Sequence, residues 1–203
     1  MLISIITILS VLIASIFYLL PYTEKQLFRE KENALKQVVE VTYMLVSDYH
    51  LRVGPGSLSE TDAREGVMAD IRSLRYGNND YIWINDLNSV ILAHPEPEEE
   101  GRDMSRVKDI NGKYYVNEFI EICKRKGDGF VYYVRPRAGS GKPVPKISYV
   151  KFFEPWGWVI GSGIYVDDVE IEMKNIRFRM ISVTFLFAFI ILIFTGFIAH
   201  IIN

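Results

Sequence analysis

The sequence predicts an α+β fold with an antiparallel sheet, flanked by two transmembrane helices. All charged residues of the 203-residue chain lie between Glu24 and Arg179, so both ends are apolar and free of charge. Between the ends, apolar residues recur at helical spacing in some segments and at a spacing of two in others. The strand-like segments come in runs that one helix interrupts, which is typical of helices packed on an antiparallel sheet.

The two apolar ends are long enough to cross a membrane. Leu2–Leu20 has 19 residues and as a helix spans about 28 Å, close to the hydrocarbon thickness of about 30 Å. Met180–Ile202 has 23 residues, enough to span with some tilt. A cleaved signal peptide is the alternative for the first run, but no basic residue precedes it and Pro21-Tyr22 does not resemble a small-residue cleavage site.

The predicted organisation therefore has three parts: a transmembrane helix over residues 1–21, a water-facing domain over 22–178 and a second transmembrane helix over 179–203. Two spans return the chain, so both ends lie on one side of the membrane. The positive-inside rule cannot orient the chain, because the terminal flanks carry no basic residue to count.

The first element of the domain is a long helix from Tyr22 to about Arg52, without Gly or Pro. Two neighbouring apolar ridges run along it, and together they are too wide for a solvated helix. Either one ridge covers the domain and the other meets a second copy of the chain, or both pack on one core. The ridges are Ala34, Val38, Val41, Leu45, Tyr49 and Leu35, Val39, Thr42, Val46.

Gly54–Ser57 ends this helix, and Ser59 with Asp62 forms a capping pattern for a second helix that we expect to end near Tyr76–Asn79. The period then changes to two. Tyr81–Asp86 and Val90–Ala93 predict a hairpin around an Asp-Leu-Asn-Ser turn.

The second half of the domain begins with an acidic loop, Glu96–Gly101, and a turn at Asp109–Gly112 that leads into a helix through Ile122. Three strands and a final helix follow. The strands are Gly129–Arg135, Lys146–Phe153 and Gly157–Tyr165, the first two joined through a tip at Ala138–Pro143, and the helix runs from Asp167 into the second apolar end.

Enzyme, metal and nucleic-acid sites are not indicated. Gly141-Lys142 lacks the glycine and the Ser/Thr of a phosphate-binding loop, and no nucleophile–base pair or zinc-ligand spacing occurs. Cys123 is the only cysteine and lies on an apolar helical stripe, so we expect it to be buried. A net charge of −2 argues against nucleic acid. We therefore expect no catalytic residues, no metal and no cofactor.

The strands instead carry aromatic and cationic residues at positions that share a face. Tyr81 lies with Trp83, Tyr133 with Arg135, and Lys146 with Ser148 on the face opposite Tyr149, while Arg75 precedes the sheet. A cavity lined by such residues suits a small anion, because the rings exclude water and the cations donate charge-assisted hydrogen bonds. By themselves these residues are also compatible with an ordinary core or surface.

An ordered series of short motifs makes the pattern specific. Over about residues 24–170 the sequence resembles the single Cache domain of bacterial chemotaxis receptors and sensor histidine kinases. The motifs are Arg75-Tyr76, Asp80–Asp86, His94-Pro95, Gly101–Asp103, Asp109–Lys113, Gly129–Tyr133, Pro145–Lys151 and Trp156–Asp168.

The resemblance implies a PAS-like sheet of five or six antiparallel strands with a long N-terminal helix, outside the cytoplasmic membrane. It implies a short carboxylate as ligand, of the acetate, propionate, pyruvate or lactate type. The residues that fall on the family's pocket motifs are Arg75, Trp83, His94, Tyr133 and Lys146, with Tyr81 and Tyr149 as further candidates.

The sequence thus predicts a receptor of the inner membrane that binds a small organic acid, pairs as a homodimer through its long helix and signals through its membrane helices. The chain stops just after the second apolar end, where we expect a cytoplasmic output domain to follow. The alternative is a structural, dimerising ectodomain with a vestigial pocket. It predicts no effect of any ligand.

Overall fold

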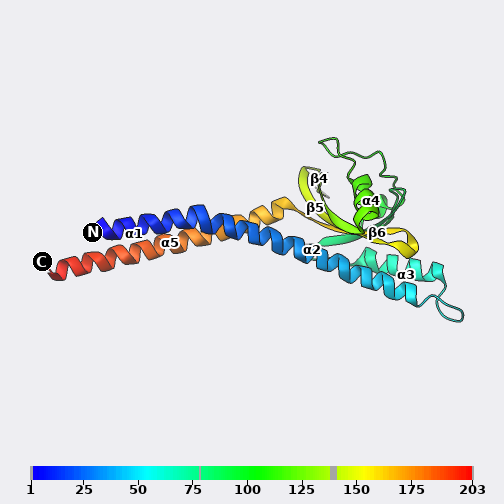
Figure 1. Ribbon diagram of the computed structural model, residues 1–203, viewed down its shortest axis with the longest axis horizontal. Helices are drawn as coiled ribbons and strands as arrows, with labels where there is room; N and C mark the ends of the chain where they lie inside the picture. Colours follow the sequence, from blue (N-terminus) through cyan, green and yellow to red (C-terminus); the bar gives the residue numbers. More distant parts are fainter. Residues whose placement is uncertain (1, 78, 138–140, 203) are drawn as a thin grey trace. The chain divides into compact units, whose positions relative to one another are not determined.

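The computed structural model describes residues 2–77, 79–137 and 141–202. The chain divides into two compact units, one of residues 31–167 and the other of residues 1–30 with 168–203. Each has its own packing. The first unit holds the sheet and every hollow discussed below, and Figure 1 shows its elements.

Four helices matter for this unit. α2 (Leu20–Leu51) enters it, α3 (Glu60–Ser73) follows, and α4 (Tyr115–Lys126) comes between strands. The predicted cap of α3 is confirmed, because Ser59 Oγ accepts a hydrogen bond of 3.1 Å from the backbone N–H of Asp62. α5 (Val166–Ile202) begins at the last residues of the unit, as predicted.

The sheet has six strands, and all the pairings are antiparallel. The order is β1-β2-β6-β5-β4, with β3 also paired to β2. The α+β prediction is confirmed. The strands are β1 (Arg75–Tyr76), β2 (Asp80–Asp86), β3 (Ile91–Ala93), β4 (Asp128–Pro136), β5 (Pro143–Phe153) and β6 (Trp158–Tyr165).

Helices cover the two faces of this sheet (Figure 1). α2 lies on one face, where Lys151 of β5 pairs with Glu40 and Tyr43 packs edge-on to Phe153 at 5.4 Å between ring centroids. α3 lies beside α2, joined by the Tyr49 hydroxyl, which donates to Asp70 over 2.7 Å. α4 lies on the other face, which is the face of the site.

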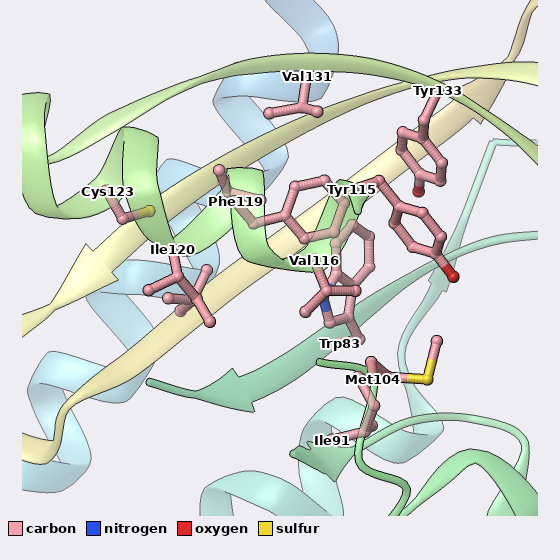
Figure 2. Close-up of a cluster of buried hydrophobic side chains, with 12 residues drawn as sticks. Trp83, Ile91, Met104, Tyr115, Val116, Phe119, Ile120, Cys123, Val131 and Tyr133 are labelled. Atoms are coloured by element: carbon pink, nitrogen blue, oxygen red, sulfur yellow. The ribbon is translucent and has the colours of Figure 1, made fainter. Parts of the chain in front are cut away.

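A cluster of buried side chains fills the space between α4 and the sheet. Figure 2 shows the rings of Trp83, Tyr115, Phe119 and Tyr133 gathered at one end of it and Cys123 at the other. Cys123 is 2% exposed, and burial raises the pKa of its thiol to about 12, as expected for a packing residue. The cluster is therefore aromatic where it borders the site and aliphatic away from it.

Two helix ends differ from the sequence prediction. The second helix ends at Ser73, and Arg75-Tyr76 is strand β1, paired with Tyr81 and Asp80. α4 runs one turn beyond Ile122, to Lys126, and ends at Gly127, whose φ of 84° suits glycine. Of the predicted hairpin tip, residues 138–140 lie outside the described residues.

The exposure of the two apolar ridges of α2 shows in part whether both of them pack on one core. Leu35, Val39, Thr42 and Val46 are buried, with Val39 and Val46 fully so. On the other ridge Val41 is 67% exposed, and the neighbouring Met44 is 72% exposed. One ridge thus covers the domain, and the other leaves apolar side chains open.

The second unit consists of helical segments. α1 (Leu2–Ala14) and a π-helical turn (Ser15–Leu19) lead into α2, and Glu24 of α2 pairs with Arg177 of α5 over 2.9 Å. Among the described helices, α5 alone is long and apolar enough by itself to cross a membrane, over Val166–Ile198. Because a π-helical turn interrupts the first apolar run, the first transmembrane span and the two-span topology stay predictions.

Candidate functional site

Two adjoining hollows lie between the sheet and the α4 side of the domain. The inner cavity is narrow, and the outer cleft of about 470 Å³ opens beside it. Tyr81, Glu99, Tyr115 and Arg135 line both, so the cleft is the approach to the cavity. The cavity is lined by Tyr81, Trp83, Ile91, His94, Glu99, Tyr115, Val116, Phe119, Tyr133, Arg135 and Lys146.

The strand pleat explains why these residues meet. Alternate residues of β2 point to the cavity, and the same holds for β4 and β5. Tyr133 pairs with Lys146 across the β4–β5 ladder, and Lys146 pairs with Tyr165 across the β5–β6 ladder. The cations and rings of three strands therefore come together at one end of the sheet.

Lys146 is the most deeply buried charged group of the cavity, at 1% exposure. Its Nζ donates to the Tyr81 hydroxyl over 3.0 Å and lies 4.4 Å and 4.7 Å from the ring centroids of Tyr81 and Tyr165. Burial lowers the pKa of this ammonium to about 8, with Tyr165 opposing and Arg135 adding to the shift. Lys146 is thus mostly charged at neutral pH and uses one of its three donors on a described partner.

Arg135 is the second cation, and 19% of its side chain is exposed. Its Nη2 lies 3.1 Å from Glu99 Oε2, the distance of an ion pair. The geometry falls short of a hydrogen bond, because Glu99 Oε2 is buried without a hydrogen-bond partner among the described residues. The guanidinium therefore keeps donors available for an acceptor inside the cavity.

His94 closes β3 and adds a neutral ring. Its Nδ1 accepts the backbone N–H of Glu96 over 3.0 Å, and its ring packs edge-on to Tyr81 at 4.8 Å between centroids. Burial, with the charges of Arg135 and Lys146, lowers the pKa of this imidazole to about 4. At neutral pH the ring is uncharged, and Nε2–H is its remaining donor.

Aromatic rings form the apolar wall (Figure 2). Tyr115 of α4 stacks on Tyr133 with 4.4 Å between centroids, and Trp83 packs on Phe119 at 5.6 Å. The Tyr133 hydroxyl shares a hydrogen bond of 3.0 Å with Ser148 Oγ. The wall shields Lys146 from water, which strengthens any charge-assisted hydrogen bond made there.

Two glycines of β6 make room for this arrangement. A Cβ on Gly161 would collide with the indole of Trp83, and one on Gly163 would lie 2.8 Å from Lys146 Cε and closer still to Ser148 Oγ. Side chains of β5 and β2 occupy the space that β6 leaves empty. These glycines are therefore part of the site, although they offer no polar side chain.

The structure brings five of the seven predicted site residues to the cavity: Trp83, His94, Tyr133, Lys146 and Tyr81. Arg75 does not line it. Its Nη1 donates to the carbonyls of Arg72 and Leu74 over 2.8 Å each, because β1 holds it at an exposed edge of the sheet.

Tyr149 does not line the cavity either. It is one residue out of phase with Lys146 and Ser148 on β5, so it faces α2, where Lys36 Nζ lies 5.6 Å from its ring centroid. Its ring packs on Phe130.

Four charged or aromatic residues of the lining were not among the predicted site residues: Glu99, Tyr115, Phe119 and Arg135. A signal existed for Arg135, because it shares a strand face with Tyr133. Phe119 lies on the apolar stripe of α4 that includes Cys123 and was assigned to packing, whereas no role was predicted for Tyr115. Glu99 lies in a loop whose position depends on the fold.

The inner cavity can hold an anion but is tightly closed. Its volume is about 10 Å³, roughly what one water molecule needs. No cluster of metal-binding side chains occurs among the described residues. A carboxylate is larger than this space, so neighbouring side chains have to move before it can enter.

A second groove of about 580 Å³ runs along another stripe of α4 and is lined by Asn117, Glu121 and Lys124, among others. Its buried polar groups are already paired: Ser89 Oγ donates to Asn117 Oδ1, and Asn117 Nδ2 donates to the Ser105 carbonyl. The groove offers no cage of rings or buried cation, so the inner cavity is the stronger candidate site.

Comparison with known proteins agrees with this geometry. A family model described as a Cache domain matches residues 5–184. The chain is 36% identical over 150 residues to the methyl-accepting chemotaxis protein McpP of Pseudomonas putida, covering 73% of this chain and 28% of that protein. The chain therefore spans little more than a quarter of that relative's length.

Two solved structures are similar at 40% identity and a TM-score of 0.66. One is a periplasmic sensor domain of a chemotaxis protein, with 68% of this chain and 97% of that one covered. The other is described as the structural basis for carboxylic acid recognition by a Cache chemosensory domain, with 70% and 97% covered.

The fit between Trp83 and Gly161 is testable by a double-mutant cycle. Gly161→Ala is expected to destabilise the fold by about 1–3 kcal/mol, because the added methyl group has to displace the indole. In a Trp83→Phe background, where the outer ring is absent, the same change is expected to cost less. Urea unfolding of the four full-length chains in detergent measures the coupling. Additive effects of the two changes would contradict the fit.

Proposed function

This chain belongs to the Cache domain family, and on that premise we propose that it is the sensory part of a transmembrane receptor for a C2–C4 carboxylate. The observation that carries the proposal is the pair of cations, the buried Lys146 and the half-buried Arg135, in an aromatic cavity with donors left over. The solved relative named for carboxylic acid recognition supports the ligand class.

In the proposed complex the carboxylate takes the place of the Tyr81 hydroxyl at Lys146 and binds Arg135 with its other oxygen. His94 and Tyr133 orient it, and Trp83 with Phe119 covers its short apolar end. At a best case of about 1.5 kcal/mol per heavy atom, six-atom pyruvate gains roughly 9 kcal/mol, which corresponds to micromolar affinity.

We also propose that the sensor domain lies outside the cytoplasmic membrane, with both apolar ends as spans and a cytoplasmic output domain receiving the signal. The periplasmic relative and the apolar length of α5 support this placement. The domain boundaries of 1–21, 22–178 and 179–203 remain the proposed ones. No catalytic role is proposed.

The Lys146 assignment predicts a loss of binding on Lys146→Met, which keeps the length of the side chain and removes its charge. Propionate affinity of the full chain in detergent, measured by calorimetry, is expected to fall about 10- to 100-fold, as for the loss of a charged hydrogen bond. Arg75→Gln is the control and is expected to leave affinity unchanged, since Arg75 lies outside the cavity.

Unchanged binding in Lys146→Met would refute the site. Absence of binding of every C2–C4 carboxylate to the native chain would refute the ligand class and favour the dimerising ectodomain instead.

The same lysine predicts how binding depends on pH. The carboxylate stays ionised above pH 6. Burial lowers the pKa of Lys146 to about 8, so the lysine loses its proton as the pH rises through 8. Affinity is therefore expected to be flat from pH 6 to 7.5 and then to fall by up to tenfold per unit. Calorimetry in buffers of different ionisation enthalpy should show proton uptake on binding near pH 9. A fall of equal size in Lys146→Met would exclude Lys146 as its cause.

The exposed ridge of α2 supports a homodimer through this helix, the partner predicted from the sequence. Val41 lies opposite the buried ridge, so Val41→Cys is expected to form disulfide-linked dimers in membrane vesicles under mild oxidation. Lys36→Cys, exposed on another side of α2, is the control and should link far less. Cys123 is buried and does not interfere. Equal linkage at both positions would argue against this interface.

A further inference from the structure

Glu99 is the only carboxylate in the described lining of the inner cavity. It belongs to a short 3₁₀ turn, Pro97–Glu99, in the acidic loop, and its side chain is 13% exposed. It lines the outer cleft as well, so it stands where a ligand passes from cleft to cavity. The two neighbouring loop residues Glu96 and Glu98 do not line the cavity.

The two oxygens of Glu99 have different partners. Oε1 accepts from Arg102 Nη1 over 2.6 Å at the exposed rim, whereas Oε2 faces Arg135 Nη2 at 3.1 Å in the interior. The inner contact is an ion pair without a well-formed hydrogen bond. Glu99 thus already offers Arg135 the type of group that a ligand would bring, but in an incomplete geometry.

The loop holds Glu99 in this place. The next residue, Glu100, accepts from the His94 backbone N–H over 2.8 Å and from Arg72 Nε of α3 over 2.7 Å. The Gly101 N–H donates to the Ile91 carbonyl over 2.8 Å. Before Glu99, the Glu96 N–H donates to His94 Nδ1 over 3.0 Å. Because the backbone is thus held on both sides, the charge of Glu99 stays near the cavity even if its side chain changes rotamer.

The charges of the cavity leave room for one further anion. Within the lining of the inner cavity, Arg135 and Lys146 are cationic at neutral pH and His94 is neutral. Glu99 brings one negative charge to this lining, and Arg102, which binds its outer oxygen, lies at the exposed rim, where water screens its charge. A monocarboxylate makes the cavity neutral. A dicarboxylate would bring a second negative charge into a space that already contains Glu99, and the repulsion between these charges is larger where the local dielectric constant is lower.

We propose that Glu99 determines the charge class of the ligand: it competes with the ligand for Arg135 and selects monocarboxylates against dicarboxylates of the same length. The inference rests on the proposed function and names the residue that narrows its ligand class. Arg135 binds a carboxylate group of the ligand, and Glu99 disfavours a ligand that carries a second carboxylate group.

Butyrate and succinate are the probes for this proposal, because both have four carbons and differ in the second carboxylate. Glu99→Gln, in the full chain in detergent, is expected to bind butyrate about tenfold more tightly, since Arg135 loses its competitor. Succinate is expected to gain more, so that the ratio of the succinate to the butyrate Kd falls at least tenfold. Calorimetry measures both.

Two further variants serve as controls for Glu99→Gln. Glu98→Gln makes the same change of charge at an exposed position of the same loop and is expected to leave the ratio unaltered. Glu99→Asp keeps the charge and is expected to keep the discrimination. It also shows whether a loss in Glu99→Gln comes from the charge or from a disturbed loop.

The proposal is overturned if Glu99→Gln leaves the ratio as it is, or weakens butyrate, which would make Glu99 a residue that merely holds Arg135. It is also overturned if Glu98→Gln changes the ratio equally. Binding of butyrate by the native chain tests the proposed function separately. If no chain binds either acid, both fall. If the native chain binds butyrate and the ratio does not respond, only the role of Glu99 falls.

Discussion

The burial of Lys146 is the constraint on which the site depends. Taking an ammonium out of water costs several kcal/mol, and the cost is recovered only through good partners. Here the partners are the faces of Tyr81 and Tyr165 and one hydroxyl, each of which contributes far less than a carboxylate would. The lowered pKa of the ammonium records that deficit. A buried cation with incomplete compensation gains more from an incoming anion than a solvated one does, and the shape of the cavity restricts that gain to small anions.

The strand order and two glycines of the sheet make the burial of Lys146 possible. Lys146 can lie inside because its strand is central, between β4 and β6, and because Gly163 of β6 leaves the space that its aliphatic stem fills. Gly161 does the same for Trp83. The glycines weaken β6 as a strand by their backbone entropy, and the packing of the neighbouring side chains into the vacated space offsets that cost. One charged and several aromatic side chains thus share one layer between the sheet and α4. The register of β4, β5 and β6 brings them together, and the rings of α4 cover them, which leaves a small closed volume.

Most of the fold but only part of the cavity lining could be predicted from the sequence, and this difference has a physical basis. Strand periodicity placed Tyr81, Trp83, Tyr133 and Lys146 on correct faces, because alternation is a local property of the backbone. The same alternation would have excluded Tyr149, which is out of phase with Lys146; the resemblance kept it as a candidate. Arg75 was chosen over Arg135 because it occupies a motif. Both arginines lie on edge strands, β1 and β4, so the type of strand does not separate them. Arg75 turns back to the carbonyls of Arg72 and Leu74 at the end of α3, whereas Arg135 lines the cavity, and only the tertiary structure shows this difference. Glu99 could not be found locally, since its loop is positioned by bonds to α3 and β3.

The end of β6 shows how occupancy of the cavity can reach the rest of the chain. Tyr165 is the last residue of β6, its ring lies against Lys146, and the next residue begins α5. Arg137, in the outer cleft, packs over the Tyr165 ring at 4.4 Å and pairs with Asp167 in the first turn of α5 over 2.6 Å. An anion that draws Lys146 away from the rings alters the surroundings of Tyr165, and so those of the first turn of α5. A ligand can shift a protein only by its difference in affinity between two arrangements. The Lys146–Tyr165 contact is a place where such a difference can arise, because it is made without a ligand and would be weakened by the movement of Lys146 in the proposed complex.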